Sequence, residues 1–149
     1  MLGYAADEVT GAPAEDRWRM NLLPGITLTV TVAGQATQGE YALVEAVVAD
    51  GTEIPPHVAQ LEDVILHVLH GELALVVDRR PSVLETGATV VLERGVPRRL
   101  TATRPTRVLA LITPAGLEQL LTVVADPATD PDDRAALLAV GGVSAVPAA

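Results

Sequence analysis

Two side chains in this sequence are well suited to acid–base chemistry and to holding an anion. His57 follows the rigid dipeptide Pro55-Pro56, and Arg98 follows the segment Gly95-Val96-Pro97. A neutral histidine can move a proton or donate a hydrogen bond, and an arginine can hold a carboxylate, an enolate or a carbonyl oxygen. Glu45 could orient the ring of His57 as its partner. These three residues form a candidate catalytic set if the fold brings them together.

Composition argues against several other kinds of chemistry. The 149 residues include no Cys, which removes disulfides, thiolate metal sites and a Cys nucleophile. The formal net charge of -9 should repel nucleic-acid phosphates and anionic lipid heads. No apolar run approaches the ~20 residues that span a bilayer, and the first residues lack the pattern of a signal peptide. We therefore expect a cytoplasmic protein without nucleic-acid or membrane partners.

The elements that must position these side chains are short predicted strands. Residues 26–32 alternate Ile, Leu and Val with Thr, which is the period of a half-buried strand. Further apolar segments follow at a spacing of roughly ten residues. They cover 41–48, 61–69, 73–77, 83–84, 89–92, 98–102 and 107–112. Such a series is expected of an all-β sandwich or barrel, and the absence of Phe predicts an aliphatic core.

Beyond residue 113 the apolar period changes to that of a helix. Four apolar residues recur at helical spacing between positions 117 and 124. The segment Asp130-Pro131-Asp132-Asp133 predicts the start of a second short helix, which Gly141-Gly142 would end. Residues 1–17 are typical of a flexible arm, and residues 143–149 of a tail that frays.

Two segments resemble the two halves of the cupin signature. The first contains Gly-Thr-Glu-Ile-Pro-Pro-His from residue 51, and the second Gly-Ala-Thr-Val-Val-Leu-Glu-Arg-Gly-Val-Pro-Arg from residue 87. The glycine frame is present at Gly51, Gly71, Gly87 and Gly95. The segments 68–73 and 113–118 also resemble small bacterial cupins of the quercetin-dioxygenase-like kind. The resemblance covers roughly residues 18–142.

This resemblance implies a particular fold and assembly. The expected architecture is a double-stranded β-helix, or jelly roll, over residues 18–113, with the helices of residues 114–142 packing on the barrel. The strand count obtained from the periodicity alone agrees with it. Such cupins are commonly dimers, so the resemblance also implies a homodimer.

Few of the family's metal-ligand positions are occupied by a metal-binding residue in this sequence. The family's three histidine positions fall on His57, Ala59 and Arg98, and its glutamate position falls on Val64. One ligand in four remains, whereas a divalent site needs at least three protein ligands. Glu62 lies two residues from the glutamate position, and a register shift that brought it inward would still leave a poor site. We therefore expect neither a metal nor a cofactor.

If the strands alternate as in the family, His57 and Arg98 face an apolar cavity inside the barrel. His67 would then lie on the outer face as a structural histidine, and His70 would be solvated in a hairpin. The expected partner is an apolar small molecule. The predicted substrate-binding residues are Tyr41, Ala59, Val64, Leu66 and Val68.

Such a cavity suits a metal- and cofactor-independent enzyme that acts on this small molecule. The expected activity is that of a cyclase, pericyclase or isomerase in natural-product biosynthesis, using cavity shape together with hydrogen bonds from His57 and Arg98. A non-catalytic cupin that binds a small molecule is the alternative, because the same cavity suffices. A metal-dependent dioxygenase is a further alternative and conflicts with the ligand positions.

Overall fold

The computed structural model describes residues 18–146; residues 1–17, predicted to be an arm, and residues 147–149 lie outside the described part. The strands of the first half are β1 (Trp18–Leu23), β2 (Ile26–Val32), β3 (Ala42–Val48), β4 (Glu53–Ala59), β5 (Asp63–His70) and β6 (Glu72–Val77). Those of the second half are β7 (Arg80–Glu85), β8 (Thr89–Leu92), β9 (Arg98–Ala102), β10 (Thr106–Thr113) and β11 (Val143–Ala145). Two α-helices, α2 (Leu117–Ala125) and α3 (Arg134–Val140), follow β10, and short 3-10 helices occupy Gly34–Thr37 and Pro131–Asp133.

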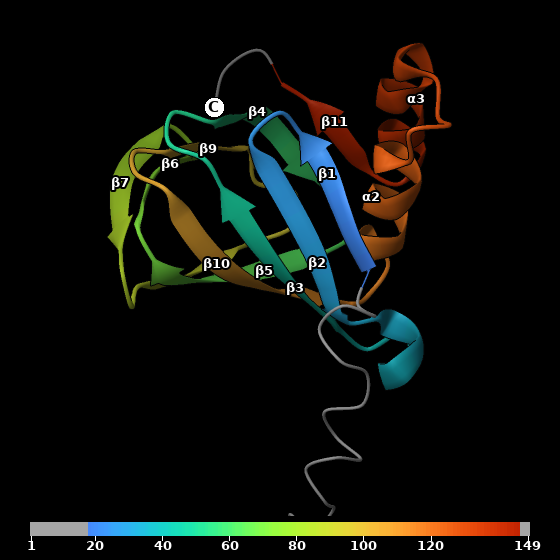
Figure 1. The fold of residues 1–149 in the computed structure, drawn as a ribbon, viewed down its shortest axis with the longest axis horizontal. Coiled ribbons are helices and arrows are strands. Elements are labelled where there is room, and N and C mark those ends of the chain that lie inside the picture. Colours follow the sequence, from blue (N-terminus) through green and yellow to red (C-terminus); the bar gives the residue numbers. More distant parts are fainter. Residues whose placement is uncertain (1–17, 147–149) are drawn as a thin grey trace, which may run out of the picture.

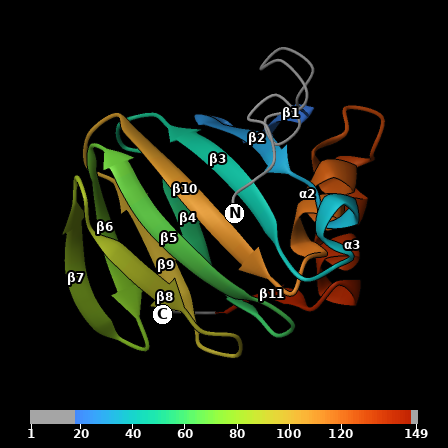
Figure 2. The same ribbon diagram turned by 90° about the horizontal axis from the view of Figure 1, so that it is seen from below.

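The strands form two antiparallel sheets that face each other as a jelly-roll barrel (Figures 1 and 2). One sheet has the order β1-β2-β3-β10-β5-β8, and the other has the order β11-β4-β9-β6-β7. Strands distant in the chain therefore pair, as when β10 inserts between β3 and β5. The all-β jelly roll expected from the sequence is confirmed.

Alternation along the strands places the aliphatic side chains between the sheets. In β3, Ala42, Val44, Ala46 and Val48 are buried, while the residues between them are partly or fully exposed. Strands β5 and β10 follow the same period of two over most of their length, and their inward residues join the same core. The core is aliphatic, as the composition predicted.

The helices bridge the two sheets on one side of the barrel. Helix α2 packs against β1, an edge strand of the first sheet, and α3 packs against β11, an edge strand of the second. Figures 1 and 2 show both helices closing that side. Among residues 18–146, no helix has the length and apolar character needed to cross a membrane.

The start of α2 is attached to the barrel by a buried acid. Glu118 is 1% exposed, and its carboxylate accepts hydrogen bonds from the backbone N–H of Gly34 at 3.0 Å and of Gly116 at 2.7 Å. Gly34 permits this approach, because a Cβ atom there would lie 2.6 Å from the Cβ atom of Ala115. The second helical segment begins as predicted, with the side chain of Asp130 accepting from the N–H of Asp132 at 2.9 Å.

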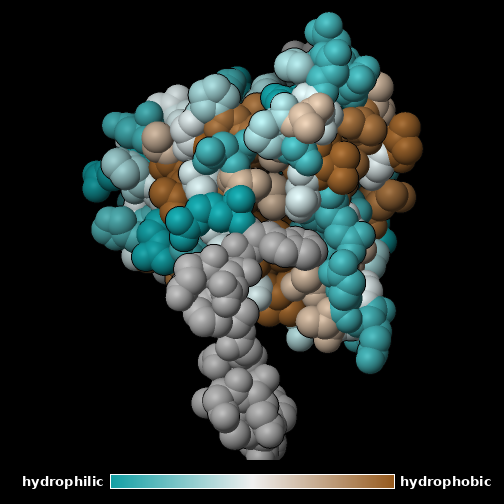
Figure 3. Space-filling view, turned by 45° about the vertical axis from the view of Figure 1, so that its right-hand side comes forward, coloured by the Kyte–Doolittle hydropathy of each residue, from teal (hydrophilic) through white to brown (hydrophobic). Residues whose placement is uncertain are grey.

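The outer surface of the helices retains apolar side chains. Val123 of α2 is 51% exposed and Val140 of α3 is 89% exposed. Figure 3 shows apolar residues among hydrophilic ones on the side of the molecule that the helices cover. The inner faces of both helices, in contrast, take part in the cavity described below.

One segment differs from its prediction in a way that affects the site. Residues 143–145, expected to belong to a frayed tail, form β11 and pair with β4, with Val143 opposite Ala59 and Ala145 opposite His57. The composition of these residues gave no strand signal, because an edge strand gains its stability from the backbone groups that β4 offers. The chain thereby covers the edge of the strand that carries His57.

Candidate active site

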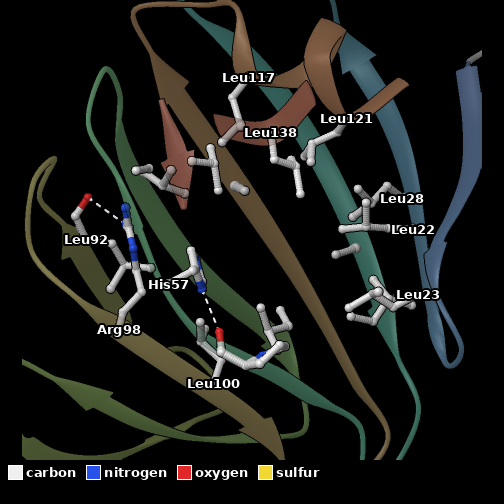
Figure 4. Close-up of a pocket in the computed structure, with 18 of the residues that line it drawn as sticks. Leu22, Leu23, Leu28, His57, Leu92, Arg98, Leu100, Leu117, Leu121 and Leu138 are labelled. Atoms are coloured by element: carbon white, nitrogen blue, oxygen red, sulfur yellow. Dashed lines mark hydrogen bonds between the residues drawn. The ribbon is translucent and has the colours of Figure 1, made fainter. Parts of the chain in front are cut away.

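A cavity of about 480 Å³ lies between the two sheets and under the helices. Inward side chains of both sheets line it together with residues of α2 and α3 (Figure 4). Nearly all of them are aliphatic, and none is Phe, Tyr or Trp. The volume is within the range of ~300–1,000 Å³ that is typical of small-molecule sites.

His57 reaches the cavity wall after a rigid corner. The pairing of β4 with β9 shifts register between Ile54 and His57, across two prolines that cannot donate ladder hydrogen bonds. The Nδ1 atom of His57 lies 2.9 Å from the carbonyl oxygen of Pro55. Because a carbonyl oxygen only accepts, Nδ1 carries the proton, and Nε2 keeps its lone pair in the neutral ring.

Arg98 is buried with most of its hydrogen-bonding capacity unused. It is 2% exposed, and its Nη1 atom donates to the carbonyl oxygen of Leu92 at 3.3 Å. Its Nε and Nη2 atoms are buried and have no partner within residues 18–146. Both ion pairs in this part of the chain involve other arginines. An unpaired buried charge costs several kcal/mol, and Nε and Nη2 are donors for which the described residues supply no acceptor.

His57 and Arg98 are paired residues on β4 and β9. Burial lowers the pKa of His57 below its usual 6.5, the hydrogen bond with Pro55 opposes this, and the charge of Arg98 lowers the pKa further. Burial also lowers the pKa of Arg98, against the nearby carboxylates of Asp63 and Glu62. Since a guanidinium remains protonated far above neutral pH, Arg98 stays charged. A neutral base thus stands beside a permanent cation at neutral pH.

Three of the predicted substrate-binding residues line the cavity, namely Ala59, Val64 and Leu66. The other two do not. Val68 points inward but is completely buried in the packed core beside the cavity. Tyr41 precedes β3 and is 42% exposed, with its backbone N–H bonded to the Oγ1 atom of Thr37.

Glu45 does not meet His57, contrary to the prediction. Alternation along β3 turns Val44 and Ala46 inward and Glu45 to the outer face of the sheet. There its Oε1 atom accepts a hydrogen bond from the Nη2 atom of Arg107 at 2.8 Å. The period of two along its own strand therefore removes Glu45 from the candidate catalytic set.

The remaining histidines lie where the sequence placed them. His67 is on the outer face, with its Nδ1 atom 2.7 Å from the Oγ1 atom of Thr89. His70 ends β5 and is exposed. Neither lines the cavity.

Glu62, two residues from the family's glutamate position, is buried but does not line the cavity. Burial and the charge of Glu118 raise its pKa, while Arg94 and Arg98 act in the opposite direction. Its Oε1 atom has no hydrogen-bond partner in the described part of the chain. The fold thus places this carboxyl outside the reacting volume.

Sequence reasoning missed the contribution of the helices to the site. Leu117 and Leu121 of α2 and Leu138 of α3 line the cavity opposite the polar group formed by His57 and Arg98 (Figure 4). The helical spacing of the α2 leucines was a signal that one face of this helix is buried. A second lining cation, Arg134 of α3, carried no such signal, because its neighbours in the chain are acids and alanines.

Comparison with known families settles what kind of domain holds this cavity. The profile described as "Cupin domain" matches residues 44–112, which include β4, β9 and the cavity wall between them. The chain carries a cupin domain. Among curated proteins, no sequence matches this cupin.

Solved structures share the cupin fold at low sequence identity. KdgF from Halomonas sp. has a TM-score of 0.64 at 18% identity, over 72% of this chain and 96% of that chain. An RmlC-like cupin from Shewanella frigidimarina has a TM-score of 0.63 at 16% identity, over 72% and 93%. Pac13 from Streptomyces, described as a nucleoside dehydratase, has a TM-score of 0.59 at 16% identity, over 72% and 83%. At such identities the likeness concerns the fold.

The residues at the metal-ligand positions of this cupin do not fit a metal. Ala59 and Val64 line the cavity with aliphatic side chains, and Arg98 brings a positive charge to the remaining position beside His57. Throughout the described residues, no three His, Cys, Asp or Glu side chains gather as a metal site requires. The polar group of the cavity is instead suited to holding a ligand oxygen and accepting a proton.

Proposed function

We propose that this cupin is a cofactor-independent enzyme that isomerises or cyclises an apolar small molecule by proton transfer, in the setting of natural-product biosynthesis. One observation carries the proposal: the neutral ring of His57 and the unpaired donors of Arg98 lie on paired residues in the wall of an otherwise apolar cavity. These are the two groups that proton removal next to a carbonyl requires, a base and a donor to the oxygen.

The proposed reaction rearranges one substrate molecule and needs no co-substrate or cofactor. Nε2 of His57 takes a proton from a carbon next to a carbonyl, and the C–H electron pair moves to give an enolate whose oxygen accepts from Arg98. The imidazolium then returns the proton to a different carbon, which gives an isomer. In a cyclisation, the enolate carbon first attacks a second carbonyl carbon of the same molecule, the π electrons of that C=O bond move to its oxygen, and the imidazolium returns the proton to this oxygen.

The surroundings support this chemistry. The aliphatic wall excludes water, so a hydrogen bond from Arg98 to developing negative charge is stronger than in solution. The cavity folds a flexible substrate by shape, which lowers the entropy cost of cyclisation. The fold also hosts the nucleoside dehydratase Pac13, so a cupin of this build is compatible with such a catalyst.

Double-bond migration in a medium-chain β,γ-unsaturated ketone tests the proposal. The conjugated product absorbs in the ultraviolet, and deuterium from solvent marks the proton return. We expect turnover that falls by about 100-fold or more in His57→Gln and Arg98→Met. Arg99→Met serves as the matched control, because Arg99 is exposed on the other face of β9. Equal rates in all four proteins would contradict the proposal.

A non-catalytic role as a small-molecule binder is the second candidate. It is favoured by the absence of any Asp or Glu among the described residues that line the cavity, because Nε2 of His57 then has no acid to relay its proton. Tight binding of the ketone without migration of its double bond, in wild type as in His57→Gln, would support this role.

A further inference from the structure

The charges that line the cavity have one sign. Two charged side chains of the described residues contribute to its wall, Arg98 of β9 and Arg134 of α3, and no carboxylate does. This contrasts with a chain whose formal net charge is -9. A largely apolar cavity whose lining has positive groups and no carboxylate favours an anion over a neutral or cationic ligand of the same shape.

The free atoms of Arg98 define the head of that anion. Nη1 is engaged by the carbonyl oxygen of Leu92, whereas Nε and Nη2 are buried and unpartnered. Nε and Nη2 lie on one edge of the planar guanidinium, where two parallel N–H groups match two oxygens of a planar anion. A carboxylate has this form, and so does the enolate of a β-dicarbonyl.

The rest of the wall defines the body of the ligand. Leucines of α2 and α3, including Leu117, Leu121 and Leu138, lie across the cavity from Arg98 (Figure 4). The lining contains no Phe, Tyr or Trp side chain on which a planar body would stack. A volume of about 480 Å³ accommodates an aliphatic chain or ring of moderate size.

We infer that this cavity takes an amphipathic anion, with a planar two-oxygen head on Arg98 and an aliphatic body under α2 and α3. The inference rests on the proposed function, whose substrate class it names. Arg134 brings a second positive charge on the helical side, and its buried Nε atom has no partner in the described chain. It assists the approach of the anion without holding its head.

Matched ligands of one chain length test the inference by calorimetry. Decanoate, decanol and decylammonium share a body and differ in the charge of the head. With the full chain at about pH 8, where His57 is neutral, we expect decanoate to bind at least about tenfold more tightly than decanol and decylammonium not to bind. Arg98→Met should remove this preference, and Arg98→Lys should keep part of it, because a lysine offers charge without the two-donor edge.

The controls separate the head site from general effects. Arg99→Met, on the exposed face of β9, should bind like wild type. Arg134→Met should weaken decanoate by less than Arg98→Met does. A straight-chain β-diketone of the same length identifies the head: weaker binding than decanoate indicates a carboxylate, and tighter binding with the absorbance of the enolate indicates a β-dicarbonyl. Both outcomes support an anionic head.

Equal affinities for decanoate and decanol in the wild-type protein would overturn the inference, and so would binding of decylammonium. These results need no variant to fold. Results that overturn the inference also differ from results that overturn the proposed function. Selective binding of decanoate with double-bond migration that ignores His57 would contradict the function alone, whereas His57-dependent migration with no preference for an anion would contradict the inference alone.

Discussion

His57 and Arg98 stand opposite each other on β4 and β9, with both side chains in the wall of the cavity. Paired residues on neighbouring strands have Cβ atoms about 5 Å apart. At this separation the positive charge of the guanidinium contributes to keeping the imidazole neutral. The two residues therefore place a base beside a fixed cation in the wall of the cavity.

We expect Arg98→Met to leave the free protein as stable as the wild type, or to stabilise it by up to a few kcal/mol. The substitution removes a buried charge that lacks an ion-pair partner within the described residues and puts an apolar chain of similar length in its place. Urea denaturation measures the change, with Arg99→Met as control. A loss of several kcal/mol would instead show that Arg98 is a structural residue.

The rate of double-bond migration should depend on pH through His57. Because burial lowers its pKa below 6.5, kcat/KM should be flat from about pH 7 upward and should fall roughly tenfold per pH unit below the lowered pKa. A pH profile of wild type checks this. A fall that begins above 6.5 would exclude the neutral ring of His57 as the base.

The same shift links pH to stability. Between the lowered pKa and 6.5 the unfolded chain binds more protons at His57 than the folded chain does, so this residue reduces stability as pH falls through that window. The unfolding free energy of His57→Gln should therefore drop less on acidification than that of wild type. Thermal or urea unfolding over this window measures the difference, and parallel curves would contradict it.

Metal content is expected to lie well below one equivalent when the protein is purified without chelator. The cavity offers His57 and a cationic neighbour at the positions where cupins bind metal. Inductively coupled plasma mass spectrometry measures the content, and titration with iron, zinc, nickel and manganese should leave the melting temperature unchanged. Stoichiometric, tightly held metal would restore a dioxygenase as the leading candidate.

Replacement of Leu121 by Trp should shorten the space for the ligand body. Leu121 lines the cavity from α2 (Figure 4), so the indole ring of a tryptophan at this position fills part of the cavity without touching the head site. We expect decanoate to lose about tenfold or more in affinity, while hexanoate changes little. Calorimetry with both acids checks this, and an equal loss for the two would indicate general damage to the fold.

The buried carboxylate of Glu118 should matter for stability. It accepts from the N–H groups of Gly34 and Gly116, and Glu118→Leu would leave both unpaired in a buried environment. We expect a loss of roughly 2–5 kcal/mol, since each unsatisfied group costs about 1–3. Urea unfolding measures it. A neutral effect would mean that water reaches these amides.

The homodimer implied by the family resemblance stays a prediction. Leu43, Leu111, Ile65 and Val91 form one row across the outer face of the six-stranded sheet, which suits a second copy. Light scattering should show a dimer, and Val91→Arg should weaken it, whereas Val83→Arg on β7 should not. A wild-type monomer at micromolar concentration would contradict the prediction.

Much of the barrel could be predicted because one period of two recurs along the chain. Strand β2 alternates apolar residues with Thr, and that pattern holds wherever one face of a strand is buried. The short strands β1 and β11 lacked such a pattern. They form because edge strands of the barrel offer unpaired backbone groups, which no local composition reports.

The sequence predicted most of the cavity-wall residues that come from the strands of the barrel. It did not predict the partner of Glu45 or the part that the helices play in the cavity. His57, Arg98, Ala59, Val64 and Leu66 were placed in the wall correctly. Glu45 was assigned because its strand leads to this wall, although alternation along that strand turns its side chain outward to Arg107. The roles of the helices were missed because a helical period shows which face of a helix is apolar, and leaves open what that face covers.

The sequence by itself determined the fold class and the aliphatic core, because these follow from residue identity and short-range period. Only the tertiary structure decided that Arg98 is buried without an ion pair to any described residue, that His57 lies opposite it, and that α2 and α3 complete the cavity. Strand pairing and burial bring together residues that are far apart in the chain. The free energy of an unpaired buried charge depends on every group that packs around it.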